Sequence, residues 1–248
     1  MTESETTKQI QEVVGILDRS GSMNGKEADT VGGINTMLRE LKSNASDSDE
    51  IRVSLKLFDH EELMLWRSIP LESVEELKIS EFVPRGQTAL LDAIGHTLNF
   101  FMEKKLYDPN SYTSCLVYVA TDGLENCSKY YNRNSVKKMI QNAKEKYNID
   151  VVYLGANQNA ILEAGNIGID PTLAINYNED DTSTQAVYRA VGRVASAQRS
   201  TSESSPFGFT HPERQASQPS SSSNDNIPPP DDRHPPALHR SPRIYNPQ

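Results

Sequence analysis

The stretch that decides the fold is Ile10–Leu17, IQEVVGIL, with the loop that follows it, Asp18–Met23, DRSGSM. The β-branched residues of the first part predict a strand that ends abruptly at Asp18. In an extended loop alternate side chains point the same way, so Asp18, Ser20 and Ser22 can converge on one point. Carboxylate and hydroxyl oxygens are hard ligands that suit Mg²⁺ or Mn²⁺ better than zinc.

Strand and helix patterns alternate downstream of this loop. Apolar periodicity predicts helices at 27–42, 88–104, about 134–147, 160–164 and 181–197, and strands at 51–58, 63–69, 115–120, 151–154 and 173–177. Such alternation is typical of a mostly parallel sheet with helices on both faces. A short turn joins the strands at 51–58 and 63–69, which favours an antiparallel hairpin at one edge. We therefore expect an α/β, doubly wound, Rossmann-like fold.

Two further segments carry oxygen side chains to one edge of this sheet. Gly86-Gln87-Thr88 precedes a helix and places the Thr88 hydroxyl at its start. Thr121-Asp122-Gly123 directly follows the most apolar strand, so Asp122 lies at the carboxyl end of that strand. In open α/β sheets ligands bind at this edge, where the strand order reverses. The first loop alone is more simply a helix-capping loop, but the three segments together predict a metal site.

The D-x-S-x-S loop, the glycine-preceded threonine and the T-D-G turn, in that order, resemble the von Willebrand factor type A (vWA) family and its metal-ion-dependent adhesion site, or MIDAS. The resemblance covers residues 10–197 and implies the vWA fold. It implies five metal-site positions, some in direct contact with the metal and others acting through water: Asp18, Ser20, Ser22, Thr88 and Asp122.

Within the family, three features are similar to small intracellular bacterial-type members, including those associated with tellurium resistance. They are Arg19 in the loop, the stretch DGLENC at 122–127 and the stretch LGANQ at 154–158.

The coordination chemistry favours binding over catalysis. Mg²⁺ prefers about six oxygen ligands, so five protein groups with only two carboxylates leave a position for another ligand. An Asp or Glu from a protein partner could fill this position. We therefore expect a protein-binding module that depends on Mg²⁺ or Mn²⁺, and no enzyme.

Two other functions stay open at this point. The ion beside Asp18 could activate water for phosphoester hydrolysis, although the sequence shows no second carboxylate pair, general-base histidine or basic phosphate clamp near the site. The domain could also be a subunit that recruits an ATPase in a chaperone-like or chelatase-like complex. Lys26, Glu125 and Asn126 border the site and could contact a partner, but solvated loop residues are the simpler interpretation.

The formal net charge of −9 argues against nucleic acid as a partner, because such binding releases counterions through basic patches. No run of 18 apolar residues is present, so we expect no membrane partner. The chain opens without a secretory signal pattern. Cys115 and Cys127 do not suggest a disulfide framework, so we expect a cytoplasmic protein.

Composition divides the chain into a domain and a tail. Residues 201–248 hold ten of the fourteen prolines and nine serines, with few aliphatic side chains. Such a stretch cannot offset the entropy lost on ordering. We expect a disordered N-terminus at 1–9, a vWA domain at 10–198 and a disordered tail at 199–248. In the tail, IPPPDDRHPPAL at 227–238 could bind a proline-reading domain.

Overall fold

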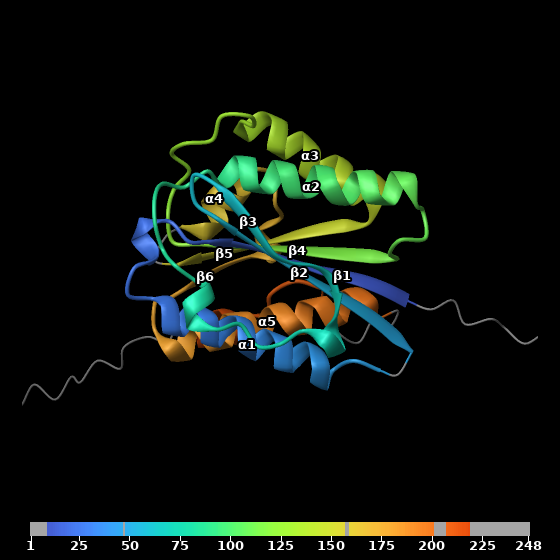
Figure 1. Cartoon of the computed structure of the whole chain (residues 1–248), viewed down its shortest axis with the longest axis horizontal. Helices are drawn as coiled ribbons and strands as arrows, with labels where there is room; N and C mark the ends of the chain where they lie inside the picture. The colour runs from blue at the N-terminus through green and yellow to red at the C-terminus, as the bar shows by residue number, and fades with distance from the viewer. Residues whose placement is uncertain (1–8, 47, 157–158, 201–206, 219–248) are drawn as a thin grey trace, which may run out of the picture.

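The computed structural model describes residues 9–46, 48–156, 159–200 and 207–218. It contains one six-stranded sheet between two layers of helices (Figure 1). The strands are β1 (Gln9–Asp18), β2 (Asp49–Phe58), β3 (Glu62–Pro70), β4 (Ser114–Thr121), β5 (Ile149–Ala156) and β6 (Ala174–Tyr177). The α-helices are α1 (Glu27–Ser43), α2 (Leu90–Tyr107), α3 (Arg133–Tyr147), α4 (Ala160–Asn166), α5 (Asp181–Arg199) and α6 (His211–Ser217).

The strand order is β3-β2-β1-β4-β5-β6, and all neighbours are parallel except β2 and β3. This confirms the predicted doubly wound sheet with one antiparallel edge strand. The chain runs outward from β1 to β3 on one side and from β4 to β6 on the other. The order therefore reverses between β1 and β4, which places the ligand-binding edge at their carboxyl ends.

Burial of apolar side chains explains why β1 and β4 lie at the centre. Every residue of β4 is buried, as is every residue of β1 from Gln11 onward. Helices α1 and α5 pack together on one face, while α2 and α3 cover the other (Figure 1). With both faces covered, the central strands are held rigidly, and the loops that follow them start from fixed points.

Helix α3 begins earlier than its sequence predicts. Asn132, rather than Asn134 or Ser135, is the N-cap, because its side chain accepts a 3.0 Å hydrogen bond from the Ser135 amide. The Ser135 hydroxyl accepts a 3.0 Å bond from the Asn132 amide in return. This reciprocal pairing over three residues selects Asn132 as the cap. Helix α2, by contrast, begins later than predicted, at Leu90 rather than Thr88.

Part of the predicted tail is folded. Helix α6 packs against α5 and β6, and Phe209 just before it is only 7 % exposed. Arg193 of α5 pairs with Glu213, and Arg214 donates a 2.7 Å hydrogen bond to the Ala174 carbonyl. This segment is held mainly by charged contacts and one buried aromatic side chain. Its apolar residues therefore do not recur at helical spacing, and the sequence does not predict the helix.

The other predicted disordered residues, 1–8, 201–206 and 219–248, lie outside the described residues. Strand β1 begins at Gln9 and α5 ends at Arg199, each one residue beyond the predicted limits of the domain. None of the helices in the described ranges is both long and apolar enough to cross a membrane.

Candidate metal centre

The first part of the site is the loop after β1. Asp18 is the last residue of β1 and is fully buried. Its Oδ1 accepts a 2.7 Å hydrogen bond from the Ser20 amide, which bends the chain back toward the carboxylate. The hydroxyls of Ser20 and Ser22 share a hydrogen bond of 3.1 Å. Ser20 is buried and Ser22 is exposed, so the loop opens to solvent at Ser22.

The second part follows β4, the strand next to β1. The Ser22 hydroxyl donates a 2.6 Å hydrogen bond to Asp122 Oδ1, which joins two residues 100 positions apart. Thr121 Oγ1 donates a 2.6 Å hydrogen bond to the other carboxylate oxygen of the first loop, Asp18 Oδ2. The parallel register of β1 and β4, with Leu17 opposite Ala120, sets these contacts.

Thr88 supplies the third part, from the segment between β3 and α2. A Cβ built on Gly123 would lie 3.3 Å from Thr88 Oγ1, 3.6 Å from Ser22 Oγ and 3.7 Å from Asp18 Oδ2. Oxygens of the loop after β1 and of Thr88 therefore face one point beside Gly123, and Gly123 itself belongs to the segment after β4, next to Asp122. Glycine at this position leaves the space between the oxygens open, because a Cβ there would contact all three.

The structure thus brings the five predicted residues together at one edge of the sheet. Two carboxylates and three hydroxyls form a set of hard oxygen donors without sulfur or nitrogen, which fits Mg²⁺ or Mn²⁺. The site is built from the end of β1 and the loop after it, the residue after β4, and the segment just before α2. It could hold a divalent ion through Asp18, Ser20, Ser22, Thr88 and Asp122.

Burial of Asp18 raises the pKa of its carboxyl group to about 6. Hydrogen bonds from Thr121 and Ser20 partly offset this increase, and the negative charge of Asp122 adds to it. Burial and a neighbouring like charge both disfavour the ionised carboxylate. A divalent cation would favour the ionised form, so the electrostatics of the site also fit a metal ion.

Asn126 and Glu125 hold the segment that carries Thr88 in place. Asn126 Oδ1 accepts a 3.0 Å hydrogen bond from the Thr88 amide, and the Asn126 amide donates one of 3.1 Å to the Thr88 carbonyl. Glu125 accepts hydrogen bonds from the Leu91 amide in the first turn of α2 and from the Ser128 amide. Asn126 is exposed and Glu125 is partly exposed, as expected for loop residues, but Asn126 also positions the backbone at Thr88 and Glu125 the backbone at Leu91.

Two charged neighbours complete the surroundings. The Lys26 ammonium contacts both Asp122 Oδ2 and Glu179 Oε1. Sequence reasoning placed Lys26 at the border of the site but missed Glu179. This residue follows β6, and no local pattern links it to the first loop.

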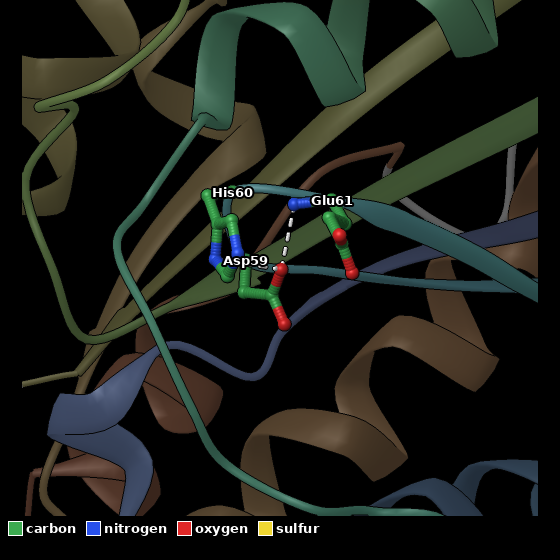
Figure 2. Close-up of side chains that lie close together, drawn as sticks. All are labelled: Asp59, His60 and Glu61. Atoms are coloured by element: carbon green, nitrogen blue, oxygen red, sulfur yellow. Dashed lines mark hydrogen bonds and ion pairs between the residues drawn. The ribbon is translucent and has the colours of Figure 1, made fainter.

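A cluster of Asp59, His60 and Glu61 lies in the turn between β2 and β3 (Figure 2). Asp59 Oδ2 lies 3.0 Å from Arg19 Nε and 2.9 Å from Arg85 Nε, and Asp59 Oδ1 accepts a 2.6 Å hydrogen bond from the Glu61 amide. Two guanidinium groups already neutralise this buried carboxylate. The cluster therefore braces the loop after β1 through Arg19, and its buried carboxylate is already paired with two cations.

Comparison with known proteins identifies the family. Residues 12–190 match the family model described as the von Willebrand factor type A domain. The chain belongs to this family. No curated protein matches it significantly.

Several solved structures share the fold. The vWF domain of a type V pili tip protein from Porphyromonas gingivalis has a TM-score of 0.57 and 12 % identity, covering 79 % of this chain and 98 % of that chain. Proximal thread matrix protein 1 from the mussel byssus has a TM-score of 0.55 and 16 % identity, covering 77 % of this chain and 47 % of that chain.

A second structure of the byssal protein, with a zinc-occupied MIDAS motif, has a TM-score of 0.51 and 16 % identity, covering 75 % of this chain and 46 % of that chain. Our chain thus spans about half the length of the byssal protein. At these identities the likeness shows the fold alone.

Proposed function

We propose that this vWA domain binds a protein partner through a Mg²⁺ or Mn²⁺ ion. The observation that carries the proposal is that oxygens of the first loop and of Thr88 lie around one point beside Gly123, while Ser22 of that loop is hydrogen-bonded to Asp122. The residues that would hold the ion are Asp18, Ser20, Ser22, Thr88 and Asp122. The zinc-occupied MIDAS motif of the byssal protein supports metal binding at this site of the fold.

The coordination chemistry explains why the partner would supply a carboxylate. Five protein groups with two negative charges leave an octahedral ion with an open or water-filled position. Ser22 is exposed, so this side of the site is accessible to a large ligand. An Asp or Glu of a partner would displace water and complete the shell.

Capture of partners on the immobilised full chain tests this proposal. We expect capture with Mg²⁺ or Mn²⁺, loss in EDTA, and loss in Asp18→Ala with the fold retained. Asp150→Ala is a matched control, because Asp150 lies near the start of β5, away from the carboxyl edge. Capture that survives both EDTA and Asp18→Ala would contradict the proposal.

Phosphoester hydrolysis is the weaker alternative. His60 contacts Asp59 and His96 contacts Glu62, so neither histidine is engaged with the candidate metal residues. Assay of the purified protein with generic phosphoesters and Mg²⁺ separates the two functions. Turnover that Asp18→Ala abolishes would reverse this ranking. The native mass of the endogenous complex tests the other alternative, a subunit that recruits an ATPase.

Within the family, we propose kinship with the small intracellular bacterial-type members that include tellurium-resistance proteins, on the sequence features at Arg19, 122–127 and 154–158. The cytoplasmic location stays a prediction. The proposed proline-rich ligand at 227–238 also stays a prediction, since it lies outside the described residues.

A further inference from the structure

Lys26 lies beside the candidate metal site and contacts two carboxylates. Its Nζ donates hydrogen bonds to Asp122 Oδ2 and to Glu179 Oε1. The Asp122 side chain is only 2 % exposed, so the ammonium reaches a carboxylate with little access to water. Ser22 donates to the other oxygen of the same carboxylate. Asp122 is thus shared between the metal loop and Lys26.

The chemistry of helix ends does not explain a lysine at this position. Lys26 is the N-cap residue of α1, and its side chain makes no capping hydrogen bond. N-caps favour Ser, Thr, Asp or Asn, and the positive end of the helix dipole repels a cation. The two carboxylates, rather than the helix, therefore hold this side chain in place.

We propose that Lys26 competes with the divalent ion for Asp122 and so sets the metal concentration at which the site fills. This inference rests on the proposed metal-binding function. The ammonium and the ion are both drawn to the Asp122 carboxylate. Like charges a few ångströms apart at a partly buried site repel each other appreciably. The ammonium therefore opposes binding of the ion for as long as it contacts Asp122.

Glu179 provides the place to which the ammonium withdraws. Lys26 already contacts it, and the Glu179 side chain is 22 % exposed, compared with 2 % for Asp122. The ammonium can keep this second ion pair while it gives up the first. Lys26 therefore weakens metal binding without blocking it.

The Mg²⁺ affinity of the full chain, measured by isothermal titration calorimetry, tests this inference. Removal of the charge in Lys26→Met is expected to tighten Mg²⁺ binding by about 2- to 5-fold, as estimated from the strength of a single ion pair near the protein surface. Lys26→Arg keeps the charge and is expected to bind Mg²⁺ more weakly than Lys26→Met. Lys146→Met makes the same charge change on the exposed last turn of α3 and should leave the affinity near that of wild type.

A double-mutant cycle separates local competition from a general effect of charge. Glu179→Gln should weaken Mg²⁺ binding in the wild-type background. Without the Glu179 carboxylate, the Lys26 ammonium is held more strongly at Asp122. In the Lys26→Met background the same change should have a clearly smaller effect. Equal effects in both backgrounds would show that Glu179 acts only as a distant charge and would overturn the assigned role.

Unchanged or weaker Mg²⁺ binding by folded Lys26→Met would also overturn the inference. If that variant unfolds, Lys26→Gln provides the same comparison with a polar side chain. If the wild-type protein binds Mg²⁺ at least as tightly as Lys26→Met, the role assigned to Lys26 is wrong, but the proposed metal-binding function still stands. A failure of both proteins to bind Mg²⁺ or Mn²⁺ would instead contradict the proposed function, and the role of Lys26 would fall with it.

Discussion

Asp18 is fully buried at the end of β1, and burial is the main reason that its pKa is raised from 3.8 to about 6. A carboxyl group with a higher pKa in the folded chain binds its proton more tightly there than in the unfolded chain. The metal-free protein therefore loses stability as the pH rises from about 4 to about 6, and the loss persists above that range. The full loss is at most about 3 kcal/mol.

Asp18→Asn is expected to stabilise the metal-free protein. The amide keeps an oxygen that can accept the Ser20 hydrogen bond, but it cannot acquire the unfavourable buried charge. In EDTA, the free energy of unfolding should exceed that of wild type by about 1–3 kcal/mol at pH 7.5, and by less at pH 4.5. Urea unfolding at the two pH values measures this difference. A variant less stable than wild type at both would show that the charge of Asp18 is not unfavourable.

The raised pKa of Asp18 also predicts how metal binding depends on pH. Protons and Mg²⁺ compete for Asp18, so the affinity should fall as the pH drops below about 6. The fall should approach about tenfold per pH unit, since one proton must be displaced. Calorimetric titration with Mg²⁺ at pH 7.5, 6.0 and 5.0 measures it. Equal affinities at pH 7.5 and 5.0 would rule out Asp18 as a titrating metal-site residue.

At the scale of elements, the loop between β4 and α3 controls where Thr88 lies. Asn126 pairs with both the amide and the carbonyl of Thr88. We expect Asn126→Ala to weaken Mg²⁺ binding by about 3- to 10-fold, because a lost hydrogen bond of about 1 kcal/mol frees the backbone that carries the Thr88 hydroxyl. Calorimetry on the full chain measures this change.

Asn132→Ala is the matched control for that variant. It removes the N-cap of α3, at a cost of about 1 kcal/mol, without a contact to Thr88. Its Mg²⁺ affinity should equal that of wild type. If both asparagine variants lose affinity equally, the effect reflects general destabilisation rather than the position of Thr88.

The elements themselves could be predicted because their apolar periodicity is local. Strict alternation in 51–58 and the apolar run at 115–120 correspond to β2 and β4. The contacts that shape the site could not be predicted in this way. Thr121 meets Asp18 across 103 residues, and Asn126 meets Thr88 across 38. Such pairings depend on strand register and loop path, which leave no periodic signal in the sequence.

At the scale of the whole molecule, α6 extends the domain beyond its predicted end. Phe209 is 7 % exposed and Glu213 pairs with Arg193 of α5. A chain that ends at Ser200 should therefore unfold with a free energy lower by about 2 kcal/mol or more, the value of one buried aromatic side chain. Thermal and urea unfolding would measure this loss.

A chain that ends at Gln218 is the control for the shorter one. It keeps α6 and should unfold at the same urea concentration as the full chain. If the chain that ends at Ser200 is equally stable, α6 contributes nothing to the fold. If the chain that ends at Gln218 loses stability, residues after 218 contribute to it.

The position of the candidate site within the whole molecule was predictable, because the order of β-α units places the ends of β1 and β4 at the point of reversal. The contact between Lys26 and Glu179 could not be predicted from the sequence. Their pairing joins the start of α1 to the end of β6, and only the folded sheet brings these segments together.

One titration tests the central claim, that the three segments form a single divalent-metal site. Mn²⁺ is added to the full chain, and the free ion is followed by its electron paramagnetic resonance signal. We predict one bound Mn²⁺ per wild-type chain and loss of this binding in folded Asp18→Ala. Absence of binding to wild type, or equal binding by the variant, would contradict the claim.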